Sequence, residues 1–344
     1  MEFVTNFSQV TGSRLAKIRA MSSGDTGSGK SRLAFSMPRQ NRIGIFPLEP
    51  NCRTSLDRII VMEPDPESVY LIPQFNFMHL DLPENITDPD WFEQYYDRRC
   101  KELQAAAANE KKTYYQPNKD DMRQALDEKN IRTYYLGLWN DIKSIGRVFS
   151  NKKISSALID SGTELYDIVC LALLGRRPRF GDKAADLSVI HYELRMFLNL
   201  FKDNNLLITH HEKAEFRSFD NVAKPTGMMI HDGWKRLGYN MDLYIEHIKI
   251  DNDDKLRYVK TKFHRKDAKL TDYAAIVRKS TARPMLVGAK DGSGVLLNHE
   301  ISFAQLISRV WPNTDLIDDW GYSEEEVLRF VTAAEEYYQA ELEL

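Results

Sequence analysis

The sequence predicts an α/β fold built on a mainly parallel sheet with an antiparallel hairpin at one edge. Apolar runs at residues 18–21, 42–49, 68–74, 154–162 and 205–211 are separated by segments with helical spacing of apolar residues. Strands that alternate with helices are typical of parallel sheets. Residues 242–250 and 257–265 instead alternate apolar and polar residues on either side of "DNDD", which predicts the hairpin.

The order of these segments divides the chain into four parts. Residues 1–80 carry the first strands of the core, and residues 133–297 carry the rest of it. Residues 81–132 are densely charged and contain "LQAAAANEKK", which favours a helical insertion at the surface. Residues 298–344 are acidic with helical spacing, and they predict a small C-terminal helical lobe.

Composition excludes several classes of protein. The net charge is −3, so a nucleic-acid partner would need a local basic patch. The three cysteines form no CxxC pair, which argues against a zinc knuckle or a disulfide framework. The N-terminus lacks the pattern of a signal peptide, and the longest apolar run, at residues 168–174, is far shorter than the about 20 residues that span a bilayer. We therefore expect a soluble protein without membrane contact.

The stretch "SSGDTGSGKS" fits the pattern of a phosphate-binding loop, G-x-x-x-x-G-K-[ST], between a strand and a helix. Its glycines allow positive φ, so that successive backbone N–H groups can point at phosphate oxygens. Lys30 can reach the β- and γ-phosphates, and the Ser31 hydroxyl can bind Mg²⁺. A flexible glycine-rich turn is the alternative. The predicted nucleotide-binding residues are Gly24, Asp25, Thr26, Gly27, Ser28, Gly29, Lys30, Ser31 and Arg32.

Asp160 ends the apolar run "SALID" and is the second predicted ligand of the metal. Ligands of open α/β sheets bind at the carboxyl ends of the strands, so Asp160 should lie beside the loop and hold Mg²⁺ through water. The alternative is a helix N-cap before "SGTELY", and the two roles are compatible.

From residue 16 to residue 269, the order of these pieces resembles a RecA-like P-loop ATPase core, similar to phage-encoded RecA-like proteins of recombination and single-strand annealing. The resemblance implies ATP and Mg²⁺ as cofactors, ATP hydrolysis, homo-oligomers with composite ATP sites, and a bacterial or phage-infected cytoplasm. The insertion, the short N-terminal segment and "FPLEP" in place of Asp-Ala-Glu depart from the family and leave the filament state open.

The resemblance also suggests catalytic residues. Glu49, after the second strand, falls where the family has its water-activating base, although a solvated turn glutamate fits as well. His210 and His211 fall where the family senses the γ-phosphate, with His211 the favoured residue and a core histidine the alternative. Lys260 and Lys262, with Arg265 as a further candidate, fall where cations reach the neighbouring subunit's γ-phosphate. A solvated basic edge strand is the alternative.

Two segments match the family's DNA-binding loops, at residues 175–183 and 212–236. Both carry cations, which can contact phosphates, and the second also carries aromatic residues that can stack on bases, as suits single-stranded DNA. Solvated loops without a ligand are the alternative, as is a P-loop switch that acts on a protein partner without DNA. The predicted DNA-binding residues are Arg176, Arg177, Arg179, Lys213, Phe216, Arg217, Lys224 and Trp234.

Overall fold

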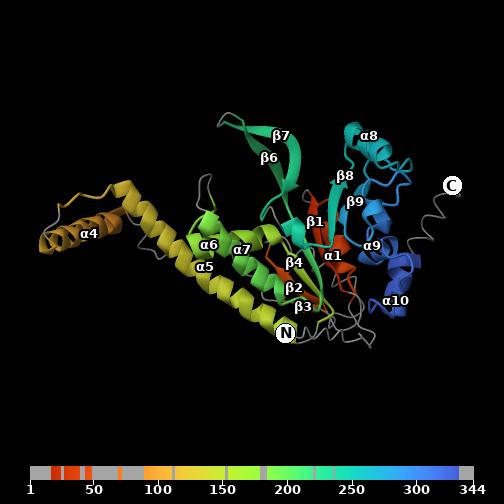
Figure 1. Ribbon diagram of the computed structural model, residues 1–344, viewed down its shortest axis with the longest axis horizontal. Coiled ribbons are helices and arrows are strands. Elements are labelled where there is room, and N and C mark those ends of the chain that lie inside the picture. The colour runs from red at the N-terminus through yellow and green to blue at the C-terminus, as the bar shows by residue number, and fades with distance from the viewer. Residues whose placement is uncertain are drawn as a thin grey trace, which may run out of the picture.

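An eight-stranded sheet forms the centre of the molecule in a computed structural model, with the strand order β10-β9-β8-β1-β5-β4-β2-β3 (Figure 1). The structure describes residues 17–24, 27–38, 43–48, 69–71, 89–110, 113–151, 154–178, 184–219, 222–234 and 237–332. The strands of this sheet are β1 (Arg19–Gly24), β2 (Ile43–Pro47), β3 (Val69–Leu71), β4 (Ser156–Asp160), β5 (Asn205–His210), β8 (Leu243–Lys249), β9 (Tyr273–Ser280) and β10 (Val295–Leu297).

Most of the sheet is parallel, as the sequence predicts. β1 lies between β5 and β8 and is parallel to both, and β4, β2 and β3 continue the parallel part beyond β5. β9 and β10 form the antiparallel edge. The prediction of an α/β fold with a mainly parallel sheet and an antiparallel edge is confirmed. Because the parallel strands share one direction, their carboxyl ends meet at one edge of the sheet.

Helices cover both faces of the sheet. On one face, α1 (Lys30–Phe35) and α9 (Phe303–Val310) pack against Ala20, Leu207 and Ile245. On the other face, α5 (Lys119–Asn151), α6 (Gly162–Leu174) and α7 (Ala184–Asn199) pack against Met21 and Ile208. Side chains alternate between the two faces along a strand. The apolar residues in each cluster therefore show toward which face the polar side chains near the strand ends point.

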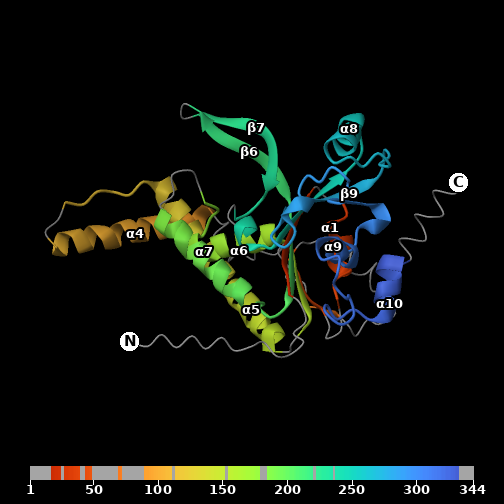
Figure 2. The same ribbon diagram turned by 45° about the vertical axis from the view of Figure 1, so that its right-hand side comes forward.

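A helical arm extends from the α5 side of the body (Figures 1 and 2). It consists of α4 (Pro89–Asn109) and the N-terminal part of α5, so most of the described residues of the predicted insertion are helical. The predicted boundary between residues 132 and 133 falls inside α5. This single helix of 33 residues starts in the arm and ends against the core, where Trp139 and Ile142 are buried.

A separate two-stranded ribbon projects from the carboxyl edge of the sheet (Figures 1 and 2). It is formed by β6 (Glu212–Phe219) and β7 (Val222–His231), which pair in antiparallel register and follow directly after β5. The ribbon occupies most of the second segment that the sequence analysis assigns to DNA binding. An isolated ribbon of two strands is only marginally stable without a packing partner.

The predicted hairpin is wrong in its second strand. Residues 242–250 contain β8, but β8 pairs with β9, and residues 257–265 fall mostly in α8 (Asp253–Lys262). The "DNDD" segment starts that helix, because the Asn252 side chain accepts a hydrogen bond from the Lys255 N–H. Val259 and Phe263, four residues apart, are buried on one side of α8. The helical spacing of these two buried residues, rather than an alternation of polar and apolar residues, therefore describes residues 257–265.

The C-terminal segment begins as part of the core. The buried side of α9 belongs to the same cluster as α1, through residues such as Phe303 and Ile307, and α10 (Glu324–Val327) follows it. The first residues of the predicted lobe thus complete the main body. Among the residues that the structure describes, no helix is both long enough and apolar enough to span a membrane.

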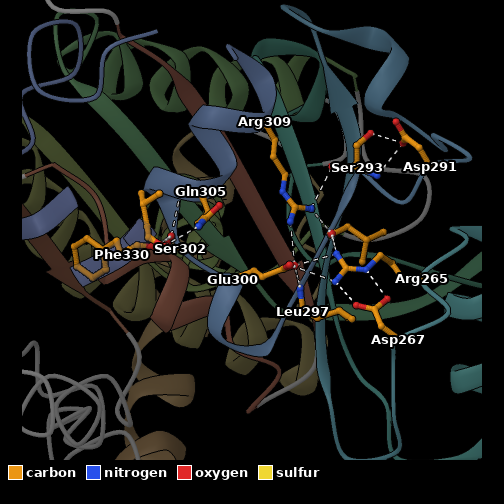
Figure 3. A network of polar contacts seen from close by, with 12 residues as sticks. Arg265, Asp267, Asp291, Ser293, Leu297, Glu300, Ser302, Gln305, Arg309 and Phe330 are labelled. Carbon is orange, nitrogen blue, oxygen red and sulfur yellow. Dashed lines mark hydrogen bonds and ion pairs between the residues drawn. The ribbon is translucent and has the colours of Figure 1, made fainter. Parts of the chain in front are cut away.

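A buried ionic network joins α9 to the segment after α8 (Figure 3). Arg265 donates hydrogen bonds to both Asp267 and Glu300, and Glu300 also pairs with Arg309 at 3.1 Å. Arg265 is buried, so the arrangement contradicts its suggested role as a cation that reaches a neighbouring subunit. Burial opposes ionisation of Glu300, but the charges of Arg309 and Arg265 outweigh it, and the pKa of this carboxyl is lowered.

We expect Glu300→Gln to lower the free energy of unfolding by about 3 kcal/mol, because it removes a charge partner from the buried guanidinium of Arg265 and from the partly buried one of Arg309. The carboxylate's contribution is present above the unfolded-state pKa of about 4.3 and is lost as the pH falls through the lower folded pKa. Urea unfolding at a series of pH values should therefore show a shallower acidic decline for the variant. Glu93→Gln, in an exposed pair with Lys119, is the control. Equal stability of Glu300→Gln and wild type would contradict the prediction.

Candidate functional site

The predicted phosphate loop lies at the carboxyl end of β1 and leads into α1. Gly24, Gly27 and Gly29 have positive φ angles of 153°, 75° and 96°, and Gly29 is the N-cap of α1. A Cβ atom on Gly24 would lie 2.5 Å from the carbonyl oxygen of His247 on β8, so only glycine fits there. Asp25 and Thr26 lie outside the described residues, and the side chains of Ser31 and Arg32 are not described. The strand–loop–helix context that the motif requires is present.

Lys30 is the first residue of α1, and its side chain turns back over the loop. Its Nζ donates a hydrogen bond of 2.7 Å to the carbonyl of Gly24, and the side chain is largely buried. The imidazole of His247 is buried close by, and burial together with the charge of Lys30 lowers the pKa of His247 to about 3. His247 is therefore neutral at neutral pH, and Lys30 supplies positive charge to the loop.

Asp160 lies two strands away from the loop, at the same edge of the sheet. β5 stands between β1 and β4, and Asp160 is the last residue of β4. Its carboxylate accepts a hydrogen bond from Thr209 on β5, and its carbonyl accepts one of 2.6 Å from Leu48 N–H. By strand alternation, Asp160 and Thr209 face the α1 side, the side on which the helix of the loop begins. The side chain is thus oriented by a hydroxyl that the sequence analysis does not single out.

The predicted base Glu49 lies outside the described residues. The alternative N-cap role after β4 belongs to Ser161, whose side chain accepts a hydrogen bond from Glu164 N–H, so Asp160 is not the N-cap residue of α6.

Another carboxylate lies close to the loop, because Glu212 accepts a hydrogen bond of 2.6 Å from Ser23 Oγ, just before Gly24. Glu212 stands in the "HHEK" segment, but its spacing alone does not reveal this contact.

The two adjacent histidines at the end of β5 have different surroundings. His210 faces the α6 side and is buried, and burial followed by the proximity of His231 lowers its pKa to about 3. His211 is partly exposed, and its N–H donates a 3.1 Å hydrogen bond to Thr163 Oγ1. The arrangement matches the core-histidine alternative for His210 and leaves His211 accessible at the edge. Its role as a γ-phosphate sensor stays a prediction.

The lysines that the resemblance assigns to a subunit interface lie on a helix. Lys260 and Lys262 occupy the last turn of α8, where positive charge also complements the helix dipole. Lys262 is exposed and Lys260 is partly exposed. The strand placement that motivated their assignment is wrong, and their action on a neighbouring ATP site stays a prediction.

The predicted DNA-binding residues fall into three groups. Arg176, Arg177 and Lys213 are described and lie near the carboxyl edge, where each has an acidic side chain close to its cation. The side chains of Phe216, Arg217 and Lys224, on β6 and β7, are not described, and Arg179 lies outside the described residues. Trp234 is only 4% exposed and stacks on His191 with ring centroids 5.1 Å apart. The ring of Trp234 is thus already packed against His191, which argues against base stacking, and its DNA contact stays a prediction.

A layer of polar residues ties the base of the ribbon to the strand that carries the loop. Ser23 on β1 bonds Glu212 at the start of β6 and lies 2.9 Å from the hydroxyl of Tyr244 on β8. His231 at the end of β7 contacts the ring of Tyr244, with centroids 6.3 Å apart. The ribbon is therefore in direct contact with the strand that carries the predicted phosphate loop, on the α6 side of the sheet.

These features define an α/β protein with a mostly parallel sheet and a candidate phosphate-binding site at the carboxyl edge. A scan against protein-family models finds no match for the chain, and a search of curated proteins finds none either.

Proposed function

We propose that the protein binds ATP with Mg²⁺ at the carboxyl edge, hydrolyses it, and acts on single-stranded DNA. The observation that carries the proposal is the arrangement of Lys30 and Asp160 at one edge, on either side of β5. The loop amides and Lys30 would hold the phosphates. The hydroxyl of Ser31 and, through water, the carboxylate of Asp160 would hold Mg²⁺, which neutralises phosphate charge during transfer.

The position of β5 supports the assignment of its end to phosphate sensing. Because β5 lies between the strand of the loop and the strand of Asp160, His211 emerges between the proposed phosphate and metal positions. In this proposal His211 contacts the γ-phosphate, and Glu49 activates the attacking water. Glu212 is a second candidate for the base, since its carboxylate accepts a hydrogen bond from Ser23, at the carboxyl end of the loop strand.

The projecting ribbon supports the DNA part of the proposal. It follows the sensor position directly, stands clear of the body, and carries the cations Lys213, Arg217 and Lys224 in its sequence. These cations can contact a phosphate backbone, and the contact of the ribbon with the loop strand gives ATP a route to influence DNA binding. A homo-oligomer in which Lys260 and Lys262 of one copy reach the ATP of the next is part of the same proposal.

The test is ATP hydrolysis with and without a single-stranded oligonucleotide, over a range of salt and protein concentrations. We expect the oligonucleotide to raise the rate and added salt to suppress this rise. The logarithm of DNA affinity should fall by about 0.7 per phosphate contact for each unit in the logarithm of salt. The rate per chain should increase with protein concentration if sites are shared between copies. A hydrolysis rate that does not change with DNA would favour a switch acting on a protein partner. A chain that binds no ATP would refute both the DNA-dependent ATPase and the switch.

A further inference from the structure

Two cations from the two segments assigned to DNA binding meet at one carboxylate, that of Asp232. Lys213, on β6, forms an ion pair with Asp232. Arg177, which follows α6, has a guanidinium nitrogen 3.9 Å from the other carboxylate oxygen of Asp232, and it also pairs with Asp167 on α6. The carboxylate thus links Arg177 and Lys213, which are 36 residues apart in sequence and meet at the base of the ribbon.

The main chain of Asp232 already holds this turn without help from its side chain. Its N–H donates a 2.7 Å hydrogen bond to the carbonyl of His211. Its carbonyl accepts one of 2.8 Å from Thr163 Oγ1 and lies 3.1 Å from the Nδ1 of His210. The ends of both ribbon strands are therefore fixed by backbone contacts, so the carboxylate can lose its partners without releasing the ribbon.

The cations are more exposed than the carboxylates that hold them. The side chains of Arg177 and Lys213 are 57% and 46% exposed, whereas those of Asp167 and Asp232 are 15% and 20% exposed. Ion pairs in such half-exposed positions contribute little to stability. An anion from solvent can therefore reach the exposed parts of both cations. A phosphodiester shares its negative charge between two oxygens, as a carboxylate does, and can pair with the same cations.

We propose that Arg177 and Lys213 together form a binding site for one phosphodiester of single-stranded nucleic acid, which the carboxylate of Asp232 occupies until the strand binds. The inference rests on the proposed function and specifies its DNA contact. The exchange is one of ion pairs only: the phosphodiester takes over the cations, and the carboxylate of Asp232 turns to water. The affinity for nucleic acid is then set by competition between an internal and an external anion.

The test compares Asp232→Asn with wild type in binding a fluorescent single-stranded oligonucleotide, with a non-hydrolysable ATP analogue and Mg²⁺ present. Asn keeps the size of the side chain and removes the competing charge. We expect binding roughly 3- to 10-fold tighter, the range for releasing two half-exposed ion pairs. Adding Lys213→Gln and Arg177→Gln to Asp232→Asn should cancel the gain. Inorganic phosphate at constant ionic strength should not displace the oligonucleotide from either protein, which separates a strand site from a general phosphate site.

Glu93→Gln is the matched control, because it removes one negative charge from a lysine pair on the distant arm. It should leave the affinity unchanged. If Asp232→Asn does not fold, Asp167→Asn removes one of the two carboxylates that pair with Arg177 and should give a smaller gain. Binding by wild type without any gain in the folded variants would overturn this inference and leave the proposed function intact. Absence of oligonucleotide binding in every protein would refute the DNA part of the proposed function as well.

Discussion

Lys30→Ala should abolish most ATP hydrolysis while the chain remains folded. Lys30 belongs to the loop rather than to an apolar cluster, and its Nζ donates a hydrogen bond to the carbonyl of Gly24 in the loop. Removing a charge that acts on phosphate oxygens in a water-poor site typically costs roughly 100- to 1,000-fold in kcat. A steady-state measurement of phosphate release, with circular dichroism as the check of folding, tests the prediction.

Lys202→Ala is a suitable control for this experiment. Lys202 is exposed and lies in the turn before β5, at the opposite edge of the sheet. The control should hydrolyse ATP like wild type. If folded Lys30→Ala also matches wild type, the loop is only a glycine-rich turn, and the assignment of the nucleotide site is lost.

Asp160→Asn should weaken the use of Mg²⁺ more than it affects the fold. Asparagine keeps an oxygen that can accept the hydrogen bond of Thr209, but it lacks the charge that attracts the cation through water. Loss of a group that supports a metal ion commonly costs 10- to 100-fold in metal affinity or activity. We expect the Mg²⁺ concentration for half-maximal hydrolysis to rise by about this factor.

The measurement is a Mg²⁺ titration at fixed ATP, with Asp141→Asn on the exposed side of α5 as the control. The control should follow the wild-type curve. An unchanged Mg²⁺ dependence in Asp160→Asn, with a normal melting temperature, would assign Asp160 a purely structural role beside Thr209.

Local patterns in the sequence predict the parts of this protein that depend on local chemistry. Glycines at fixed spacing followed by Lys30 predict a strand–loop–helix unit, because positive φ and a reversal of the chain are properties of those residues themselves. Asp160 is predicted because an apolar run that ends in a charge ends at the edge of a sheet. The mostly parallel sheet follows from the alternation of strands and helices.

The α8 segment shows how a local pattern misleads. The sequence analysis assigns residues 257–265 to a strand, although Val259 and Phe263 stand four residues apart, as on one side of a helix. Most of residues 257–265 form a helix because the Asn252 side chain caps its N-terminus and because the core buries Val259 and Phe263 together. β9, which takes the place of the expected partner of β8, carries the almost continuous apolar run "YAAIV" that suits a strand buried on both faces.

What the sequence alone determined is therefore the mostly parallel α/β class, the strand–loop–helix unit with Lys30, and Asp160 at a strand end. The tertiary structure alone decided which side chains meet: Thr209 with Asp160, Ser23 with Glu212, and Arg177 and Lys213 with Asp232. It also buried Trp234 and Arg265, which sequence reasoning had assigned to ligands. The physical reason is that strand order and the pairing of distant charges arise from long-range packing, whereas the spacing of residues along the chain reports only local conformation.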